Sequence, residues 1–325
     1  MNNQKHKAMK TTMKIMIGIA ISVLMVLGAN AQPKSEIPDD NKTKMNWAGA
    51  DTLYTFEFDA ASNSWIYFQR EVRRFNTKND PIENFVQVYA KQTKSWENYL
   101  KVNYSYDEKG KETEEITQAW DKNFNNWVNA KLRTTSYKGN QKDEILFQEW
   151  KRPTNEWFNV MKYLIKYNSS GEQNVVTVNL YNGITKNWDN HKRFNMEYEN
   201  PFNPPTIVIS ESYLNGEWKV DGKYTMEYNI RGNKTSETRY TYNQSKKNWL
   251  EGIQMELVYD KKGNQTEYIE KKYDSSIKDW ANFTRFVATY NELNYMTEKI
   301  EYTFDRNTKQ WVIVGQFKFT TDKKI

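Results

Sequence analysis

The chain has 325 residues, no cysteine, two histidines and a formal net charge of +6. Without cysteine it forms no disulfide and no thiolate metal site. Four lysines lie within the first 14 residues, so the remainder is nearly neutral and its charge does not support nucleic-acid binding.

The first 31 residues have the layout of a cleaved secretory signal. The four lysines precede an apolar run from Ile15 to Ala29, and Ala29-Asn30-Ala31 supplies a small-residue cleavage site. This run of 15 residues is shorter than the ~20 that a membrane-spanning helix needs. The sequence therefore predicts a signal peptide at 1–31 and an exported mature chain, periplasmic or extracellular, without a membrane span. A polar leader is expected at 32–51.

Nine tryptophans mark a repeat of about 31 residues through 52–325. Their spacings are all 30 or 31 residues, for Trp65, Trp96, Trp127, Trp157, Trp188, Trp218, Trp249, Trp280 and Trp311. A second aromatic stands ten residues after the Trp in eight repeats, and a third stands seven residues before it in eight. Four residues after the second aromatic, six repeats have a residue that tolerates positive φ, namely Asn79, Gly110, Gly171, Gly232, Gly263 and Asn294.

The segment after each Trp alternates in polarity. Positions 6, 8 and 10 after the Trp are mostly apolar, as in Phe194, Met196 and Tyr198, while positions 5, 7 and 9 are mostly polar. Each repeat is therefore predicted to be one β-hairpin, and nine tandem hairpins give an all-β chain of about 18 antiparallel strands. Strand twist predicts a long curled or superhelical meander sheet with the aromatic ladder on its inner face. The pattern leaves open whether the sheet closes on itself. Three prolines within 199–205 predict a kink.

Two turn segments carry a family resemblance. Tyr106 to Lys111 reads YDEKGK and Tyr259 to Asn264 reads YDKKGN, which resembles the YD-type repeats of large secreted Rhs-like proteins. The whole unit, Trp-x-Asn followed by Tyr-x-Tyr-Asp and Gly-Asn, is similar to uncharacterised β-hairpin repeat proteins exported by Gram-negative bacteria. The resemblance implies hairpins that wrap into a spiral sheet or shell, and it implies no activity. The Tyr-Asp pair stands in these two turns, while Asn follows the aromatic in four others.

The sequence offers little for catalysis. After signal removal His191 is the remaining histidine. A Ser-His-Asp triad needs histidine as its base, and one histidine cannot build a multi-histidine metal site. The glycines follow the repeat rather than a phosphate-binding loop. We therefore expect a non-enzymatic protein without catalytic residues, metal or cofactor, in which His191 is an ordinary strand residue.

A cation follows the Trp by five residues in six repeats. These cations are Arg70, Lys101, Lys162, Arg193, Lys223 and Arg285, and the tryptophans considered with them are Trp96, Trp127, Trp157, Trp188, Trp218, Trp249 and Trp280. One interpretation is that the cations cover the rings and solvate the sheet. The other is that the row binds a polymer, since aromatic rings pack on sugar faces.

Three functions follow from this pattern. The main hypothesis is a secreted or periplasmic scaffold that binds a polysaccharide, or another envelope protein, along the aromatic and cationic sheet face. The alternatives are a purely structural, envelope-associated surface protein and an outer-membrane β-barrel of about 18 strands. Against the barrel, strands such as 236–239 are polar or charged on both faces, where lipid would require an apolar band.

Overall fold

The computed structural model describes residues 52–199 and 203–321, which form 18 β-strands and no helix. The first nine strands are β1 (Thr52–Asp59), β2 (Ser64–Phe75), β3 (Pro81–Ala90), β4 (Ser95–Tyr106), β5 (Glu112–Asp121), β6 (Asn126–Lys138), β7 (Gln141–Lys151), β8 (Glu156–Tyr167) and β9 (Gln173–Asn182). The second nine are β10 (Asn187–Glu197), β11 (Ile207–Leu214), β12 (Glu217–Tyr228), β13 (Lys234–Asn243), β14 (Asn248–Tyr259), β15 (Gln265–Asp274), β16 (Asp279–Tyr290), β17 (Met296–Asp305) and β18 (Gln310–Thr321). The predicted all-β architecture of nine tandem hairpins is confirmed.

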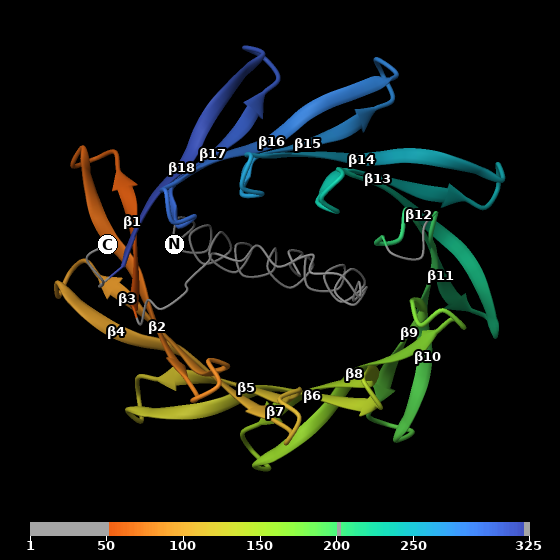
Figure 1. Ribbon diagram of the computed structural model, residues 1–325, viewed down its shortest axis with the longest axis horizontal. Helices are drawn as coiled ribbons and strands as arrows, with labels where there is room; N and C mark the ends of the chain where they lie inside the picture. Colours follow the sequence, from red (N-terminus) through yellow and green to blue (C-terminus); the bar gives the residue numbers. More distant parts are fainter. Residues whose placement is uncertain (1–51, 200–202, 322–325) are drawn as a thin grey trace.

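The sheet closes into a ring. Every strand pairs antiparallel with the next, and β1 also pairs with β18, in a register that runs from Leu53 opposite Thr321 to Glu57 opposite Phe317 (Figure 1). The prediction of a curled or superhelical meander sheet is therefore wrong, because the chain forms a single closed β-barrel. Closure removes the two edges whose unpaired N–H and C=O groups an open sheet would expose, and accumulated strand twist brings these edges together.

The ring is too wide for its walls to pack against each other. Eighteen strands at ~4.8 Å each give a circumference of at least roughly 85 Å, which corresponds to a backbone diameter of about 27 Å. Barrels of this strand number enclose a lumen rather than a filled core. The functional surfaces are consequently the lumen wall, the outer wall and the two ends.

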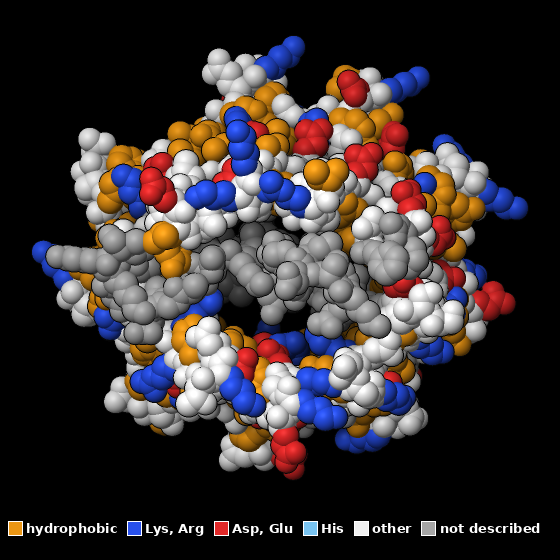
Figure 2. Space-filling view, viewed as in Figure 1, with side chains coloured by type: hydrophobic (Ala, Val, Ile, Leu, Met, Phe, Trp, Pro, Cys, Tyr) orange, Lys and Arg blue, Asp and Glu red, His pale blue; other side chains and the backbone are white. Residues whose placement is uncertain are grey.

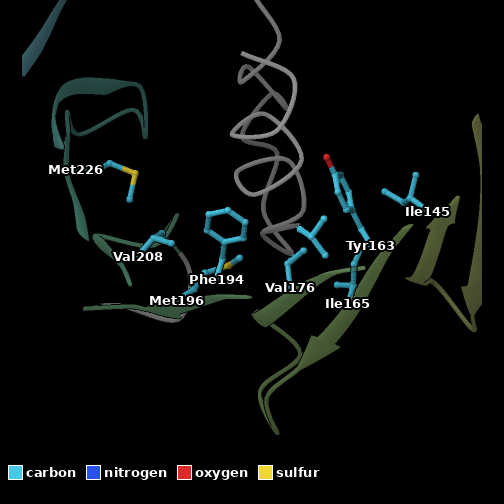
Figure 3. Packing of buried hydrophobic residues seen from close by; sticks show 9 residues of the cluster. Ile145, Tyr163, Ile165, Val176, Phe194, Met196, Val208 and Met226 are labelled. Atoms are coloured by element: carbon cyan, nitrogen blue, oxygen red, sulfur yellow. The ribbon is translucent and has the colours of Figure 1, made fainter. Parts of the chain in front are cut away.

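The largest apolar cluster lines the lumen from β7 to β12. Its side chains converge toward the inside of the barrel (Figure 3) and comprise Ile145, Tyr163, Ile165, Val176, Val178, Phe194, Met196, Val208 and Met226. Phe194 and Met196 stand six and eight residues after Trp188, so the alternating pattern correctly predicted the buried face of β10. Arg193, which precedes Phe194, faces the outside because alternate strand residues point to opposite faces.

A β-bulge follows every Trp of the repeat by three residues. In the first hairpin, Thr55 is opposite Gln69 and Phe56 is opposite Tyr67, so Phe68 is the extra residue. The bulge shifts the alternation by one, and the Trp therefore shares the outer face with the residue five positions later. The tryptophans therefore lie on the outer face, a placement that the repeat left open, and the aromatics of the inner face are those such as Phe194 and Tyr198 that follow the Trp by six to ten residues.

Beyond the bulge each hairpin separates from its neighbours. Pairing between β2 and β3 ends at Gln69 and Val88, whereas pairing between β3 and β4 continues to Ala90 and Ser95. The free hairpin ends, called tips below, splay outward around the ring (Figure 1). Each tip holds one edge-to-face aromatic pair with ring centroids 4.9–5.5 Å apart, such as Tyr242–Trp249.

The nine turns that close the tips each contain a left-handed residue, two positions before the Trp. Asn occupies this position in three tips and Gly in one, as is usual for positive φ. Five tips instead hold a lysine with φ between 52° and 59°, namely Lys94, Lys186, Lys247, Lys278 and Lys309. The left-handed conformation costs a residue with a Cβ atom about 1 kcal/mol.

The turns at the opposite end of the barrel follow the predicted pattern. All six predicted Gly and Asn positions, such as Gly263, have positive φ. In the turn before β15, the Asp260 carboxylate accepts hydrogen bonds from the backbone N–H groups of Lys262 (2.8 Å) and Asn264 (2.9 Å). Residues 200–202 of the predicted kink, like 1–51, lie outside the described residues, and β10 pairs directly with β11 on either side of that segment.

The second aromatic of the repeat ties these turns to the sheet. In six repeats its tyrosine hydroxyl donates to a backbone carbonyl of the preceding repeat, 25 residues earlier in five of them and 23 residues earlier for Tyr228. Tyr259, for example, donates to the Lys234 carbonyl at 2.9 Å. This bond explains why the repeat has Tyr rather than Phe at nearly every such position.

Barrel closure predicts a specific cross-link. Thr55 and Phe319 are opposite each other across β1 and β18, and antiparallel partners have the ~4.5–5.5 Å Cα separation that a disulfide accepts. We expect the Thr55→Cys/Phe319→Cys variant to oxidise to an intramolecular disulfide that migrates faster on a non-reducing gel. The chain has no other cysteine. The Thr55→Cys/Ile145→Cys variant is the control and should stay reduced; cross-linking in both variants, or in neither, would contradict closure at this seam.

The turn carboxylate predicts a pH-dependent effect. Burial raises the pKa of Asp260, but hydrogen bonds from Asn264, Lys262 and Gly263 outweigh it, so the pKa lies below its usual value. Asp260→Ala should lower the free energy of unfolding at neutral pH by about 1 kcal/mol, and this difference should shrink below about pH 4, as the carboxylate becomes protonated. Asp260→Asn, which matches Asn291 of a sister turn, should stay near the wild type. Urea denaturation of all three proteins measures this, and an Ala variant of full stability would contradict it.

Candidate functional site: the outer tryptophan row and the lumen wall

The predicted cations lie over tryptophans of the outer face. In five cases the cation of one repeat stacks on the Trp of the next, with cation-to-ring distances of 4.7–5.2 Å for Arg70–Trp96, Lys101–Trp127, Lys162–Trp188, Arg193–Trp218 and Lys223–Trp249. In each contact the cation belongs to the last paired residues of its strand, as Arg70 opposite Gln87 does, and it reaches the Trp of the next tip, where pairing with that strand has ended. They agree with the interpretation that cations cover the rings.

Several cations of the row are also paired with carboxylates on the outer face. Arg193 lies 2.6 Å from Glu211, Lys162 lies 3.2 Å from Glu144, and Arg285 lies 2.5 Å from Glu267. All nine tryptophans are half-buried. A ligand that bound along the row would have to displace these contacts, and ligand binding by these residues stays a prediction.

The row also departs from the predicted set. The position five residues after the Trp is Leu132 before Trp157 and Gln254 before Trp280. Trp157 instead packs on Trp150, and Trp280 packs on Tyr273. Arg285 lies over Tyr302, 5.5 Å from the ring centre.

Closure adds a pair that the repeat spacing does not predict. Lys318 lies 4.5 Å above the ring of Trp65, and Phe68 contacts Phe317 at a centroid distance of 6.1 Å. Lys318 stands seven residues after Trp311, not five. Only the ring brings the last repeat beside the first, so no local signal in the sequence could have indicated these contacts.

One sector of the lumen wall holds a buried carboxylate cluster on β13. Glu237 is opposite Met226 and Met255 on the lumen face and is fully buried. Its carboxylate contacts Lys234 Nζ at 2.5 Å and Arg239 Nε at 2.7 Å. Two cations around one buried carboxylate satisfy both of its oxygens.

A second polar sector lies on β2–β6. Arg133 contacts Glu112 and Glu115, each at 2.5 Å. Glu71 accepts from Arg73 at 2.8 Å and from Asn84 Nδ2 at 2.6 Å. The lumen wall is thus divided into an apolar sector over β7–β12 and charged sectors on either side. Alternation predicted a lumen face but not the ion pairs, since these side chains come from strands whose neighbours only the register defines.

The described residues offer no metal centre. No group of three or more His, Cys, Asp and Glu side chains among them is arranged to hold a metal ion. His191 is the extra residue of the bulge in β10 and is exposed. Within the same residues, no helix is long and apolar enough to cross a membrane.

Comparison with known proteins finds no matching family model and no matching curated protein. Similar solved structures include a protein of unknown function from Bacteroides fragilis NCTC 9343, with 16% identity over 41% of this chain and 95% of that chain and a TM-score of 0.36. A DUF3836 family protein from Bacteroides vulgatus ATCC 8482 has 21% identity over 28% of this chain and 90% of that chain, with a TM-score of 0.26. A porin-like protein from Bacteroides uniformis ATCC 8492 has 9% identity over 84% of this chain and 98% of that chain, with a TM-score of 0.39.

The closed barrel distinguishes among the three predicted functions. A scaffold that binds along an open sheet needs a continuous free face, whereas this sheet encloses a lumen. Closure and an even number of strands are features of outer-membrane barrels. The architecture therefore supports the outer-membrane β-barrel alternative over the scaffold.

The buried carboxylate predicts a large stability effect. Glu237→Ala leaves Lys234 and Arg239 without their carboxylate and should lower the free energy of unfolding by about 3 kcal/mol, measured by urea denaturation. The control is Glu256→Ala, because Glu256 pairs with Lys271 on the outer face and its side chain is 40% exposed. The control should lose less than about 1 kcal/mol. Equal losses in the two variants would show that the lumen cluster has no special role.

Proposed function

We propose that this protein is an exported β-barrel of the cell envelope that holds or conducts a ligand in its lumen. The observation that carries the proposal is the pairing of β1 with β18, which converts nine hairpins into a closed wall. An 18-stranded ring is wide enough for a small molecule to enter.

The lumen wall supports a ligand with both apolar and polar groups. Its apolar sector offers aliphatic and aromatic contacts on β7–β12. The charged sectors around Glu237 and Arg133 flank it with groups that can donate and accept hydrogen bonds. Because these charges are already paired, they favour orientation of a ligand over attraction of a highly charged one.

Insertion in the outer membrane is the first of two arrangements for such a barrel. Strand number and closure support it, and each strand of the ring has a hydrogen-bonded neighbour strand on both sides, which leaves no open sheet edge to the lipid.

A barrel standing in water within the envelope is the second arrangement, and the outer wall favours it. Charged side chains face outward in the middle of the sheet, among them Lys101, Glu144, Arg193, Glu256 and Arg285. A lipid-facing charge near the bilayer centre costs roughly 2–4 kcal/mol. Pairing with carboxylates and rings reduces this cost only in part. The outer-wall charges therefore support the water-exposed arrangement, while closure and strand number support the outer-membrane one.

Fractionation of cells that export the protein tests the proposal. We expect the protein in the envelope fraction. Retention in membranes after urea and carbonate washes would establish the outer-membrane arrangement, whereas release by high salt would establish the water-exposed one. A protein found only in the cytoplasm would contradict the proposal as a whole.

A further inference from the structure

The turns at the tips form a cationic rim. The rim consists of the nine turns at 60–63, 91–94, 122–125, 152–155, 183–186, 215–216, 244–247, 275–278 and 306–309. These turns contain ten Lys and Arg residues and no Asp or Glu, and the exposed carboxylates next to them are Glu156, Glu217 and Asp279, each directly after a turn. Figure 2 shows Lys and Arg side chains at the outermost points of several hairpins.

The opposite end of the barrel has no such excess. Its eight connections, from 76–80 to 291–295, contain six Lys and Arg residues and seven Asp and Glu residues. Both ends of the barrel consist of short, exposed turns. The two ends therefore differ in the net charge of their turns rather than in the kind of structure that forms them.

Three rim cations are engaged by carboxylates. Lys122 pairs with Glu97, Arg152 with Asp121 at 2.6 Å, and Arg306 with Asp274 at 3.3 Å. The five lysines in the left-handed conformation are exposed, and none of them has an ion-pair partner within the described part of the chain. Their charges are available to a partner.

Those five lysines occupy a position at which lysine is unfavourable. The same position is Asn or Gly in the other four tips, where positive φ is better tolerated. A disfavoured backbone conformation that recurs with one charged side chain indicates a role for that side chain outside the fold. Here the repeated element is an exposed ammonium group.

Apolar side chains stand among the rim lysines. Phe124, Ile184 and Ile277 lie in the rim turns and are 76%, 94% and 63% exposed. A nucleic acid or an acidic polysaccharide binds through its charges and through stacking on aromatic rings, and neither contact involves exposed aliphatic side chains such as Ile184 and Ile277. Apolar side chains among lysines instead suit a lipid surface. There the apolar side chains enter the headgroup region and the ammonium groups lie beside the lipid phosphates.

We propose that the cationic rim docks the barrel, tips first, on an anionic lipid surface. The five left-handed lysines contact lipid phosphates, and Phe124, Ile184 and Ile277 insert at headgroup depth. This inference rests on the water-exposed arrangement of the proposed barrel and goes beyond it, because it concerns the outside of one end and does not depend on what the lumen holds.

Vesicle co-sedimentation of the exported protein tests the rim. The probes are vesicles of phosphatidylglycerol with phosphatidylcholine, and vesicles of phosphatidylcholine alone. The rim variant replaces five lysines by Asn, the residue of three sister turns: Lys94→Asn, Lys186→Asn, Lys247→Asn, Lys278→Asn and Lys309→Asn. The matched control makes the same replacement at the opposite end: Lys78→Asn, Lys109→Asn, Lys111→Asn, Lys261→Asn and Lys262→Asn. Both variants change the net charge equally.

We expect the wild type to bind the anionic vesicles and not the neutral ones, and we expect high salt to weaken this binding. The rim variant should bind on the order of 100-fold or more weakly, while its thermal unfolding midpoint is unchanged or higher because Asn relieves the left-handed strain. The control should bind like the wild type. A third variant, Phe124→Ser/Ile184→Ser/Ile277→Ser, should bind several-fold more weakly.

Two results would overturn the proposal. Equal losses in the rim and control variants would mean that net charge alone drives binding. Absence of vesicle binding, with or without binding to heparin or DNA, would remove lipid as the partner. Neither result bears on the envelope location tested by fractionation, so the two proposals can fail separately.

Discussion

The structure depends on the pairing of its first strand with its last. Every other strand pair is joined by a turn of the chain or follows from the repeat, but β1 and β18 are separated by the whole array and are held by five opposed residue pairs. Without this seam, two strand edges would be open to other chains. With it, the molecule gains an inside and an outside, and each side chain of the repeat is assigned to one of them.

The bulge after each Trp determines which side chains share a face. Simple alternation would place a Trp and the cation five residues later on opposite sides of the sheet. The extra residue in each Trp-bearing strand, such as Tyr99 in β4 or His191 in β10, places both on the outer face. It also increases the local bend, and beyond it neighbouring hairpins part. Cation–ring contacts such as Lys223–Trp249 then connect each tip to the last paired residues of the preceding hairpin.

Charge is distributed differently over the three surfaces. In the lumen, buried carboxylates such as Glu237 are neutralised by adjacent cations, as a poorly solvated site requires. On the outer wall, a cation such as Arg193 contacts both a tryptophan ring, that of Trp218, and a carboxylate, that of Glu211. At the rim, Lys94, Lys186 and three sister lysines contact neither a ring nor a carboxylate among residues 52–199 and 203–321. Unpaired charge is thus concentrated where the hairpins project farthest, which is where a large partner can reach it.

The repeat in the sequence was sufficient to predict the nine hairpins, the turns with positive φ and the apolar alternation that faces the lumen. These features are local, because Gly263 closes its own turn and Phe194 alternates with its own neighbours. Closure, the outer position of the Trp row and the lumen ion pairs were decided only by the tertiary structure. Lys318 contacts Trp65 because the closed ring places the last strand beside the first. Arg133 contacts Glu112 because the register of β5 and β6 places the two side chains on the same face. Period-two alternation in the sequence indicates neither where a β-bulge occurs nor that the first strand will pair with the last.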